Sequence, residues 1–219
     1  MKAQTGTDQR PPTTAVRRRP VQQRSLERYE RLLDACAGLL DEVGPTALTT
    51  KEVAHRAQVP IGTLYQFFSG KDSLLGALAE RNLESFLARL SARIEGAAPV
   101  GVAAFVDLAV DEFVAMKRTV AGFGHLDFGL VGAVPGDLRD DEHLLDRDLD
   151  NNAAVAERIG ALGGDLFAYP GFALSLRVAL ECADAVLKVA FRVDPEGDPA
   201  LIGECKRMLR GYLAERPAV

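Results

Sequence analysis

The segment TTKEVAHRAQVPIGTLYQFFSGK, residues 49–71, decides the fold because it predicts two short helices joined by a tight turn. Thr50 is a residue type that caps helix N-termini, because its hydroxyl accepts a hydrogen bond from a free amide of the first turn. The small apolar residues that follow, among them Val53 and Ala57, recur at helical spacing. The pattern predicts a first helix over residues 50–57.

A turn and a second helix follow. Gln58 and Val59 form the predicted turn, and Pro60 comes next. Proline disfavours helical geometry at the residue before it, yet it starts a helix well because its missing amide is not needed there. The second helix is predicted over residues 61–67. Because isolated helices shorter than about 12 residues are marginal in water, a third helix at residues 26–43 is expected to hold both.

The residues GTLYQFFSGKDSLL, 62–75, closely resemble the recognition-helix signature of TetR-type (tetracycline-repressor-like) transcriptional regulators. In that signature a small residue and Thr precede Leu-Tyr and an aromatic residue, and a Lys opens the next helix. The resemblance covers about residues 20–80, including the lead-in RSLERYERLLDACAGLLDEVG. It implies a helix-turn-helix whose second helix enters the major groove of DNA. An ordinary helical hairpin is the structural alternative.

The resemblance implies specific DNA contacts. Thr50, Thr63 and Tyr65 look like contacts to phosphate or bases, and Lys71 looks like the phosphate contact at the start of the fourth helix. The residues expected to face bases are Ile61, Gly62 and Gln66. Gln66 has the chemistry for a bidentate contact with adenine, worth about 1 to 3 kcal/mol against the wrong base. A solvated surface amide is the alternative for this side chain.

The chain departs from the family pattern at Phe67. Many relatives carry a His here that touches the DNA backbone. A phenyl ring cannot make that polar contact, so the ring is expected to pack against the protein or to meet a sugar.

Composition predicts a soluble protein with a sizeable core. The chain has 219 residues, of which 47% are hydrophobic, and is long enough to bury about 70% of its unfolded surface. The longest apolar-leaning run, residues 172–193, is broken by five charged residues, and the N-terminus lacks the apolar core of a signal peptide. The protein is therefore expected in the cytoplasm, with no membrane partner.

Charge is unevenly distributed along the chain. The formal net charge is −5, whereas DNA binding draws on Lys and Arg that neutralise phosphates. Residues 1–24 nevertheless carry six basic groups against one acidic group. Residues 1–21 are predicted to be a disordered arm, whose Arg17, Arg18 and Arg19 are expected to enter the minor groove. A solvated tail without DNA contacts is the alternative.

The expected fold is all-α, with the basic arm, a helix-turn-helix domain at residues 22–70, and a helical effector-binding and dimerisation domain at residues 71–219. No alternating strand pattern occurs in the last of these. Its helices are predicted at residues 71–94, 100–120, 138–160, 168–193 and 199–215.

A glycine-rich apolar segment, residues 121–137, interrupts these helices. It holds five glycines, and each costs a helix about 1 kcal/mol relative to alanine, so a broken or short helix is expected. Such a segment is a candidate wall of a small-ligand pocket, and a loop that merely packs is the alternative. The candidate lining residues are Phe105, Phe113, Met116, Phe123, His125, Asp127, Phe128, Phe167 and Phe172. A plain hydrophobic core is the alternative for the apolar ones.

The helix predicted at residues 168–193 is apolar on more than one side, so it must be covered by its own domain and by something else. In relatives of the TetR type the second cover is the same pair of helices from another subunit. Two helix-turn-helix units related by a two-fold axis would recognise a palindromic operator.

Metal and catalytic sites have little support. Asp140 and His143 have the spacing to share a metal, but a di-iron bundle needs two such pairs, and His125 has Gly122 where the partner would stand. His55 falls in the first helix of the helix-turn-helix. No GxSxG or GxxxxGK motif occurs. No metal, no cofactor and no enzymatic activity are therefore expected.

Three cysteines, Cys36, Cys182 and Cys205, are widely separated and odd in number, which offers neither a disulfide framework nor a CxxC metal site. They are expected to be small core or interface residues.

These observations predict a homodimeric repressor that a small apolar ligand releases from a palindromic operator. The alternative is a helical protein-interaction module, or a nonspecific nucleic-acid binder without an effector. An activator built on the same helix-turn-helix has the same sequence features.

Overall fold

A computed structural model describes residues 23–97, 101–126, 155–167 and 171–214, and in these ranges every regular element is helical, which confirms the predicted all-α class. The elements are α1 (Gln23–Ala47), α2 (Thr50–Arg56), α3 (Ile61–Phe67), α4 (Lys71–Ala97), α5 (Val102–Thr119), a helical stretch at residues 155–163, the 3-10 helix η1 (Gly164–Phe167), α7 (Phe172–Val193) and α8 (Pro199–Ala214).

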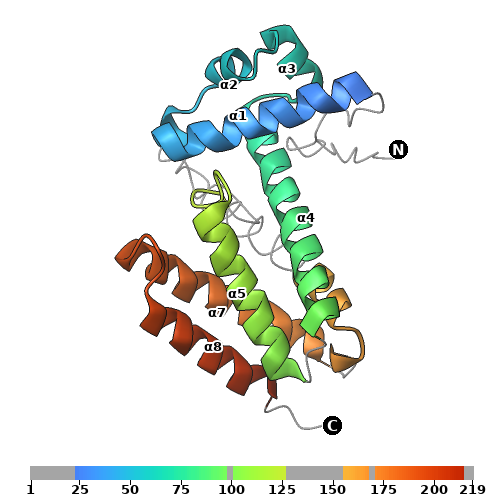
Figure 1. The fold of residues 1–219 in the computed structure, drawn as a ribbon, viewed down its shortest axis with the longest axis vertical. Helices are drawn as coiled ribbons and strands as arrows, with labels where there is room; N and C mark the ends of the chain where they lie inside the picture. The colour runs from blue at the N-terminus through green and yellow to red at the C-terminus, as the bar shows by residue number, and fades with distance from the viewer. Residues whose placement is uncertain (1–22, 98–100, 127–154, 168–170, 215–219) are drawn as a thin grey trace, which may run out of the picture.

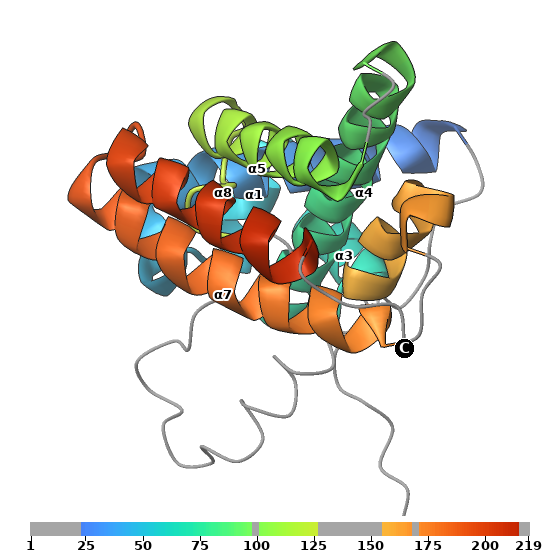
Figure 2. The same cartoon turned by 90° about the horizontal axis from the view of Figure 1, so that it is seen from below.

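The helices form two layers joined by α4 (Figure 1). Helix α1 lies across the upper end of α4 with α2 and α3 above it, and α5, α7 and α8 pack together at the other end. Seen from below, α5, α8 and α7 lie side by side and α4 crosses next to them (Figure 2). Helix α8 is tied to α5 by ion pairs, with Arg210 Nε 2.7 Å from Asp107 Oδ1 and Lys206 bonded to Asp111.

Each layer has its own hydrophobic core. The N-terminal core combines buried side chains of α1, α2 and α3 with the first turns of α4, up to Ala79. The C-terminal core begins at Leu83 of the same helix and continues through α5, α7 and α8. The division between the two cores therefore lies inside α4, between Ala79 and Leu83, and the domain boundary expected after residue 70 stays a prediction.

Helix α1 supports the N-terminal layer because its apolar residues form one buried stripe, which includes Leu32, Cys36 and Leu40. Its regular part ends at Gly44, whose φ of +73° lies in the left-handed region that glycine adopts without strain. The short continuation to Ala47 follows this kink. The regular part thus matches the helix predicted at residues 26–43.

The remaining helix predictions agree with the structure to within a few residues where it describes them. The helix predicted at residues 138–160 is seen only in its last part, since residues 155–160 are helical. Residues 1–21, with the predicted basic arm, lie outside the described residues, as do residues 138–154.

None of the described helices combines the length and the apolar character needed to cross a membrane. Within the described ranges, no three His, Cys, Asp or Glu side chains are grouped so that they could hold a metal ion. The Asp140 and His143 pair is not among the described residues. Cys36 and Cys205 are buried and Cys182 is half-buried, in keeping with core or interface positions.

Candidate nucleic-acid interface

Helix α2 begins at a side-chain N-cap. Thr49 has extended backbone angles, its Oγ1 accepts a hydrogen bond from Glu52 N at 3.2 Å, and its hydroxyl donates to the Glu52 carboxylate at 2.7 Å. The cap is therefore Thr49, and the prediction of Thr50 was wrong by one residue because two threonines stand side by side. Thr50 instead lies in the first turn, where its hydroxyl is 3.2 Å from the hydroxyl of Tyr65 on α3.

The turn between α2 and α3 is tight. Gln58 has a φ of +52°, a left-handed conformation that reverses the chain, and Val59 after it is buried in the N-terminal core. Pro60 stands at the N-cap of α3, and its carbonyl accepts a hydrogen bond from Thr63 N at 2.8 Å. The turn matches the one predicted from Gln58 and Val59, and it sets α3 against α2.

The seven residues of α3 divide into two faces. Leu64 is fully buried and Phe67 is 5% exposed, so this face anchors the helix in the N-terminal core. Ile61 and Tyr65, by contrast, are 42% and 44% exposed. Gly62 and Gln66 are also exposed, and Thr63 is half-buried. The side chains predicted to face bases therefore lie together on the solvent side of a helix whose other side is fixed by packing.

Phe67 packs against the protein. Its ring meets Tyr29 of α1 edge-on with centroids 5.7 Å apart, and the centroid of the Phe68 ring is 6.2 Å away. Tyr29 and Phe68 are themselves 5.2 Å apart. Of the two expectations for this position, packing holds: the ring joins α3 to α1.

Ion pairs fasten the surrounding helices. Arg56 of α2 makes two hydrogen bonds of 2.6 Å to the Glu42 carboxylate on α1, and this bonding lowers the pKa of Glu42 and raises that of Arg56. Arg81 of α4 bonds to Asp34 at 2.7 Å and to Glu30 at 3.2 Å. Three acidic groups of α1 are thus paired with arginines, which offsets part of the acidic charge of this domain.

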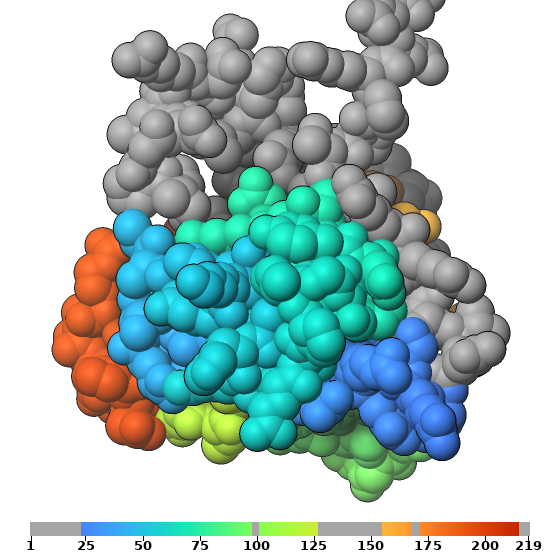
Figure 3. Space-filling model, turned by 90° about the horizontal axis from the view of Figure 1, so that it is seen from above, coloured from blue at the N-terminus to red at the C-terminus, as the bar shows by residue number. Residues whose placement is uncertain are grey.

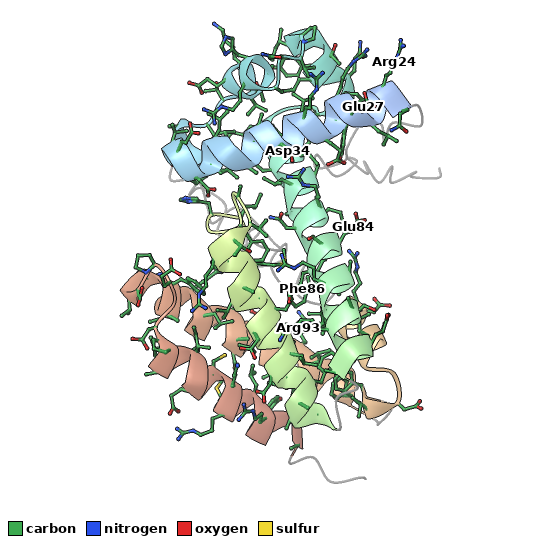
Figure 4. The ribbon with its side chains drawn as sticks, in the orientation of Figure 1. Arg24, Glu27, Asp34, Glu84, Phe86 and Arg93 are labelled. Atoms are coloured by element: carbon green, nitrogen blue, oxygen red, sulfur yellow. The ribbon has the colours of Figure 1, made fainter. Side chains whose placement is uncertain are left out.

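The outer surface of the N-terminal domain consists of α2 and α3, with the N-terminal part of α1 beside them (Figure 3). At that end of α1, Arg24 lies on the side of α3, whereas Asp34 lies where α1 crosses α4 (Figure 4). Lys71 opens α4 directly after α3, next to the Ser73 hydroxyl that donates to Gly70 O at 3.2 Å. Arg24 thus lies on the side of α3 in space, and Lys71 follows the end of α3 in the chain.

The predicted ligand-lining residues are mostly core. Met116, Phe105 and Phe123 are no more than 3% exposed, and Phe172 is 5% exposed. Phe113 packs against the same core. The structure places the exposed His125 outside this buried group, and Asp127 and Phe128 are outside the described residues.

Two aromatic groups stand out in this core. Phe167 stacks on Phe172 with centroids 4.1 Å apart and meets Phe105 edge-on at 4.7 Å. In the other group the Phe113 and Phe123 rings are 5.4 Å apart. Such contacts are those of a packed interior.

Two charged features of the C-terminal domain were not foreseen. Lys117 Nζ lies 5.7 to 6.0 Å from three ring centroids, those of Phe113, Phe123 and Phe191. Glu112 of α5 is buried, yet it pairs with two arginines of α4, one of them Arg93, which Figure 4 labels. Its Oε1 lies 2.5 Å from Arg89 Nε in a direction that makes no hydrogen bond. Only Phe113 lies on the same helix as Lys117, and the other partners come from other segments, so the sequence gives little local signal for these residues.

Comparison with protein families gives two matches. Residues 32–78 match the description "Bacterial regulatory proteins, tetR family", and residues 100–216 match "Tetracyclin repressor-like, C-terminal domain". The two matches correspond to the two layers of the structure. The family consists of regulators, which confirms the expectation that the protein is not an enzyme.

Among curated proteins, the chain is similar to the HTH-type transcriptional repressor KstR of Mycolicibacterium smegmatis, with 37% identity over 75 residues, 34% of this chain and 35% of that protein. It is also similar to KstR of Rhodococcus jostii, with 41% identity over 58 residues, 26% of this chain and 27% of that protein. The alignments thus span about a third or less of these relatives.

Solved structures give longer matches. A TetR-family transcriptional regulator from Streptomyces coelicolor has 40% sequence identity and a TM-score of 0.72, over 85% of this chain and 98% of that one. The fatty acid degradation regulator FadR from Bacillus halodurans has a TM-score of 0.57 and 16% identity, over 88% and 97% of the two chains, and shares the fold. Taken with the helix-turn-helix geometry, these matches show that the chain belongs to the TetR family and is a DNA-binding transcriptional regulator.

Proposed function

We propose that the protein is a cytoplasmic, homodimeric repressor that binds a palindromic operator through α3 and is released by a small apolar ligand. The observation that carries this proposal is the division of α3 into a buried face and an exposed face. Leu64 and Phe67 hold the helix, while Tyr65 and Gln66 are free of the core.

The exposed face of α3 suits the major groove. A helix fits that groove, and its N-terminal side chains contact base edges. A Cβ at Gly62 would meet no atom within 4 Å, so the helix presents its bare backbone to a ligand there. The hydroxyl pair of Thr50 and Tyr65 offers donors to phosphate at the junction of α2 and α3. Gln66 then supplies base readout and Lys71 a further phosphate contact.

Selection of DNA from a random pool with the full chain tests this part. The expected product is one palindrome, and Gln66→Ala should lose about 1 to 3 kcal/mol of discrimination at one base pair in each half-site. Lys188→Ala, a surface change on α7 where the lysine pairs with Asp184, is the matched control. Salt-sensitive binding without sequence preference would instead support the nonspecific binder, and no binding would support the protein-interaction module.

The dimer is supported by an apolar stripe along α7. Four of its exposed large side chains follow one another at helical spacing and share one face: Leu174, Val178, Val189 and Val193. Leu174 and Val193, at the two ends, are 63% and 62% exposed. A stripe of this length is expected to be covered by the same helix of a second subunit.

Sedimentation of two charge variants tests the dimer. Leu174→Glu puts a carboxylate in the stripe and is expected to give monomers that bind the palindrome much more weakly, because each half loses the contribution of the other. Ala173→Glu introduces the same charge at an exposed position of α7 off the stripe and should leave the dimer intact. Equal behaviour of the two variants would contradict this interface.

The effector is proposed to bind among the aromatic side chains of the C-terminal domain, near the Phe113 and Phe123 pair at the end of α5. An effector shifts DNA affinity no further than its own preference between two conformations of the protein. A screen of small apolar molecules for loss of the operator complex tests this, with direct binding to the DNA-free protein as the second measurement. Molecules that dissociate the complex without binding the free protein would argue against an effector site.

The N-terminal arm is proposed to contact the minor groove through Arg17, Arg18 and Arg19. A chain that starts at Gln22 should then show a smaller dependence of operator affinity on salt, because fewer counterions are released from DNA. An unchanged slope would show that the arm makes no phosphate contacts.

A further inference from the structure

The segment that follows α5, residues 120–126, contributes to both hydrophobic cores. Phe123 is fully buried and belongs to the C-terminal core. Leu126, three residues later, is 2% exposed and belongs to the N-terminal core. The segment is closed on itself by hydrogen bonds from His125 N and Leu126 N to Gly122 O, at 3.1 and 2.9 Å. One compact turn is therefore anchored in two cores.

The turn also rests directly on the backbone of α1. Gly122 N donates a hydrogen bond of 2.9 Å to Asp41 Oδ2. Gly122 has a φ of +75°, and a Cβ there would lie 2.9 Å from Ala37 Cα and 3.1 Å from Ala37 O. Both the conformation and the space exclude a side chain. Figure 1 shows this end of α5 directly beneath α1.

A third contact joins the turn to α4. Asn82 Nδ2 donates a hydrogen bond of 2.8 Å to Leu126 O, and Asn82 is 2% exposed. Asn82 lies between Ala79, the last α4 residue of the N-terminal core, and Leu83, the first of the C-terminal core. A buried amide that bonds a backbone carbonyl at this position ties the turn to the point where the two cores meet.

These contacts give the two domains a second connection besides α4. Through α4 alone, the two domains are held at an angle that depends on the stiffness of one helix, whereas a second attachment away from its axis resists bending and twisting of that helix. Displacement of the aromatic side chains at the end of α5 would move Phe123, and through Gly122 it would move α1, which carries α3 by way of Tyr29 and Phe67.

From this geometry we propose that the turn at residues 120–126 sets the angle of the N-terminal domain on the C-terminal domain, and hence the distance between the two α3 helices of a dimer. Asp41, Asn82 and Gly122 are then positioning residues for operator spacing. The DNA-binding test of this inference rests on the proposed function. Its second test, calorimetry, requires no DNA.

The test compares Gly122→Ala with Gly124→Ala. A Cβ at Gly124 would meet no atom within 4 Å, so the control makes the same change two residues away on the exposed side of the turn. The measured quantity is the ratio of affinities for the selected operator and for one lengthened by one base pair between half-sites. We expect Gly122→Ala to reduce this ratio about tenfold and Gly124→Ala to leave it unchanged. Simple loss of folded protein would lower both affinities equally and leave the ratio unchanged.

Asp41→Ala provides a milder variant, because Asp41 is a surface residue. It should shift the ratio in the same direction, and Asp41→Asn, which keeps an oxygen able to accept from Gly122 N, should restore it. Calorimetry of the DNA-free protein is the second readout. The wild type is expected to unfold in one transition, whereas Gly122→Ala should melt in two, with the N-terminal domain first.

The outcomes separate the two proposals. If the wild type selects no palindrome, the proposed function fails, and the calorimetric comparison alone decides whether the turn connects the domains. If a palindrome is selected but Gly122→Ala and Asp41→Ala both keep the wild-type ratio, the inference about the turn is overturned. A single transition in Gly122→Ala, at the wild-type cooperativity, would overturn it as well.

Discussion

The two domains carry their candidate sites in opposite ways. In the N-terminal domain, the candidate DNA contacts lie on the exposed side of α3, and a different set of residues holds the helix from behind. In the C-terminal domain, Phe105, Met116 and Phe172 are themselves part of the core. In a surface site, different residues contribute to binding and to stability. In an interior site, the same residues contribute to both, so a substitution there affects stability first.

The largest expected effect is in the C-terminal core. Phe172→Ala removes a ring that stacks on Phe167 and should lower the free energy of unfolding by about 3 to 5 kcal/mol. Lys188→Ala on the same helix, at an exposed side chain outside the apolar stripe, is the control for changes on α7. Chemical denaturation measures both. A loss close to that of the control would mean that Phe172 lines a site and contributes little to the core.

In the N-terminal domain the same experiment should separate the two faces of α3. Leu64→Ala is expected to cost about 2 to 5 kcal/mol of stability, because the side chain is fully buried. Ile61→Ala, at a side chain 42% exposed, should change stability little and weaken DNA binding. Denaturation and operator titration are both required, and a stability loss in Ile61→Ala as large as that in Leu64→Ala would remove the distinction between the faces.

Replacing Tyr65 and Lys71 together by alanine addresses the DNA surface and removes one exposed contact within the protein, between the Tyr65 and Thr50 hydroxyls. The double variant should fold normally and lose operator affinity by about 1 to 3 kcal/mol, measured by titration at fixed salt. If the double variant binds the selected site as tightly as the Lys188→Ala reference does, the assignment of α3 as the DNA-contacting helix is wrong.

The buried cysteines allow the stability of the two cores to be compared at alkaline pH. Burial raises the pKa of Cys36 in the N-terminal core from 9.0 to about 12 and that of Cys205 in the C-terminal core to about 11. Above pH 9 the unfolded chain releases a thiol proton that the folded chain keeps, so the free energy of unfolding should fall as pH rises towards these values. Urea denaturation at a series of pH values should show this slope.

The slope should flatten in Cys36→Ala and, over a narrower range, in Cys205→Ala. Comparing slopes rather than absolute stabilities removes the cost of the small cavity that each change leaves. If neither substitution alters the slope, groups other than these two thiols cause the loss of stability at alkaline pH.

The smallest effect on stability is expected at the surface ion pair of Glu42 on α1 with Arg56 on α2. Bonding to Arg56 lowers the pKa of Glu42, so the stabilisation is present above the ordinary value of 4.5 and is lost as pH falls through the lowered pKa. Glu42→Gln should reduce stability slightly at neutral pH and leave it unchanged in acid. Because both groups are exposed, salt should screen the difference. A large effect at neutral pH would show that the pair holds α2 in place.

The local sequence pattern was sufficient to predict most of the N-terminal domain. Apolar spacing predicted α2 and α3, and the signature around Thr63, Tyr65 and Lys71 indicated the family. The cap of α2 was misplaced by one residue, since Thr49 and Thr50 have the same chemistry and only the backbone angles distinguish them. Phe67 had two open interpretations, and the choice between them depended on Tyr29, a residue on another helix.

The C-terminal domain was less predictable at the level of single residues. A ligand wall and a loop that merely packs were both open for its glycine-rich segment, and residues 121–126 of it pack against α1 and α4. In the sequence, Gly122 shows only that His125 lacks a metal-binding partner three residues before it. Its steric role arises from Ala37, which is far away in the chain.

The order of residues along the chain was enough to establish an all-helical protein, the position of its helix-turn-helix and the family to which it belongs, because helix periodicity, turns and the α3 signature involve neighbours within a few residues. Packing in three dimensions determined which face of α3 is buried, where along α4 one core gives way to the other, and how the turn after α5 touches both. These depend on contacts between residues far apart in the chain, such as Asn82 with Leu126 and Asp41 with Gly122, whose separations follow from the packing of all the helices together.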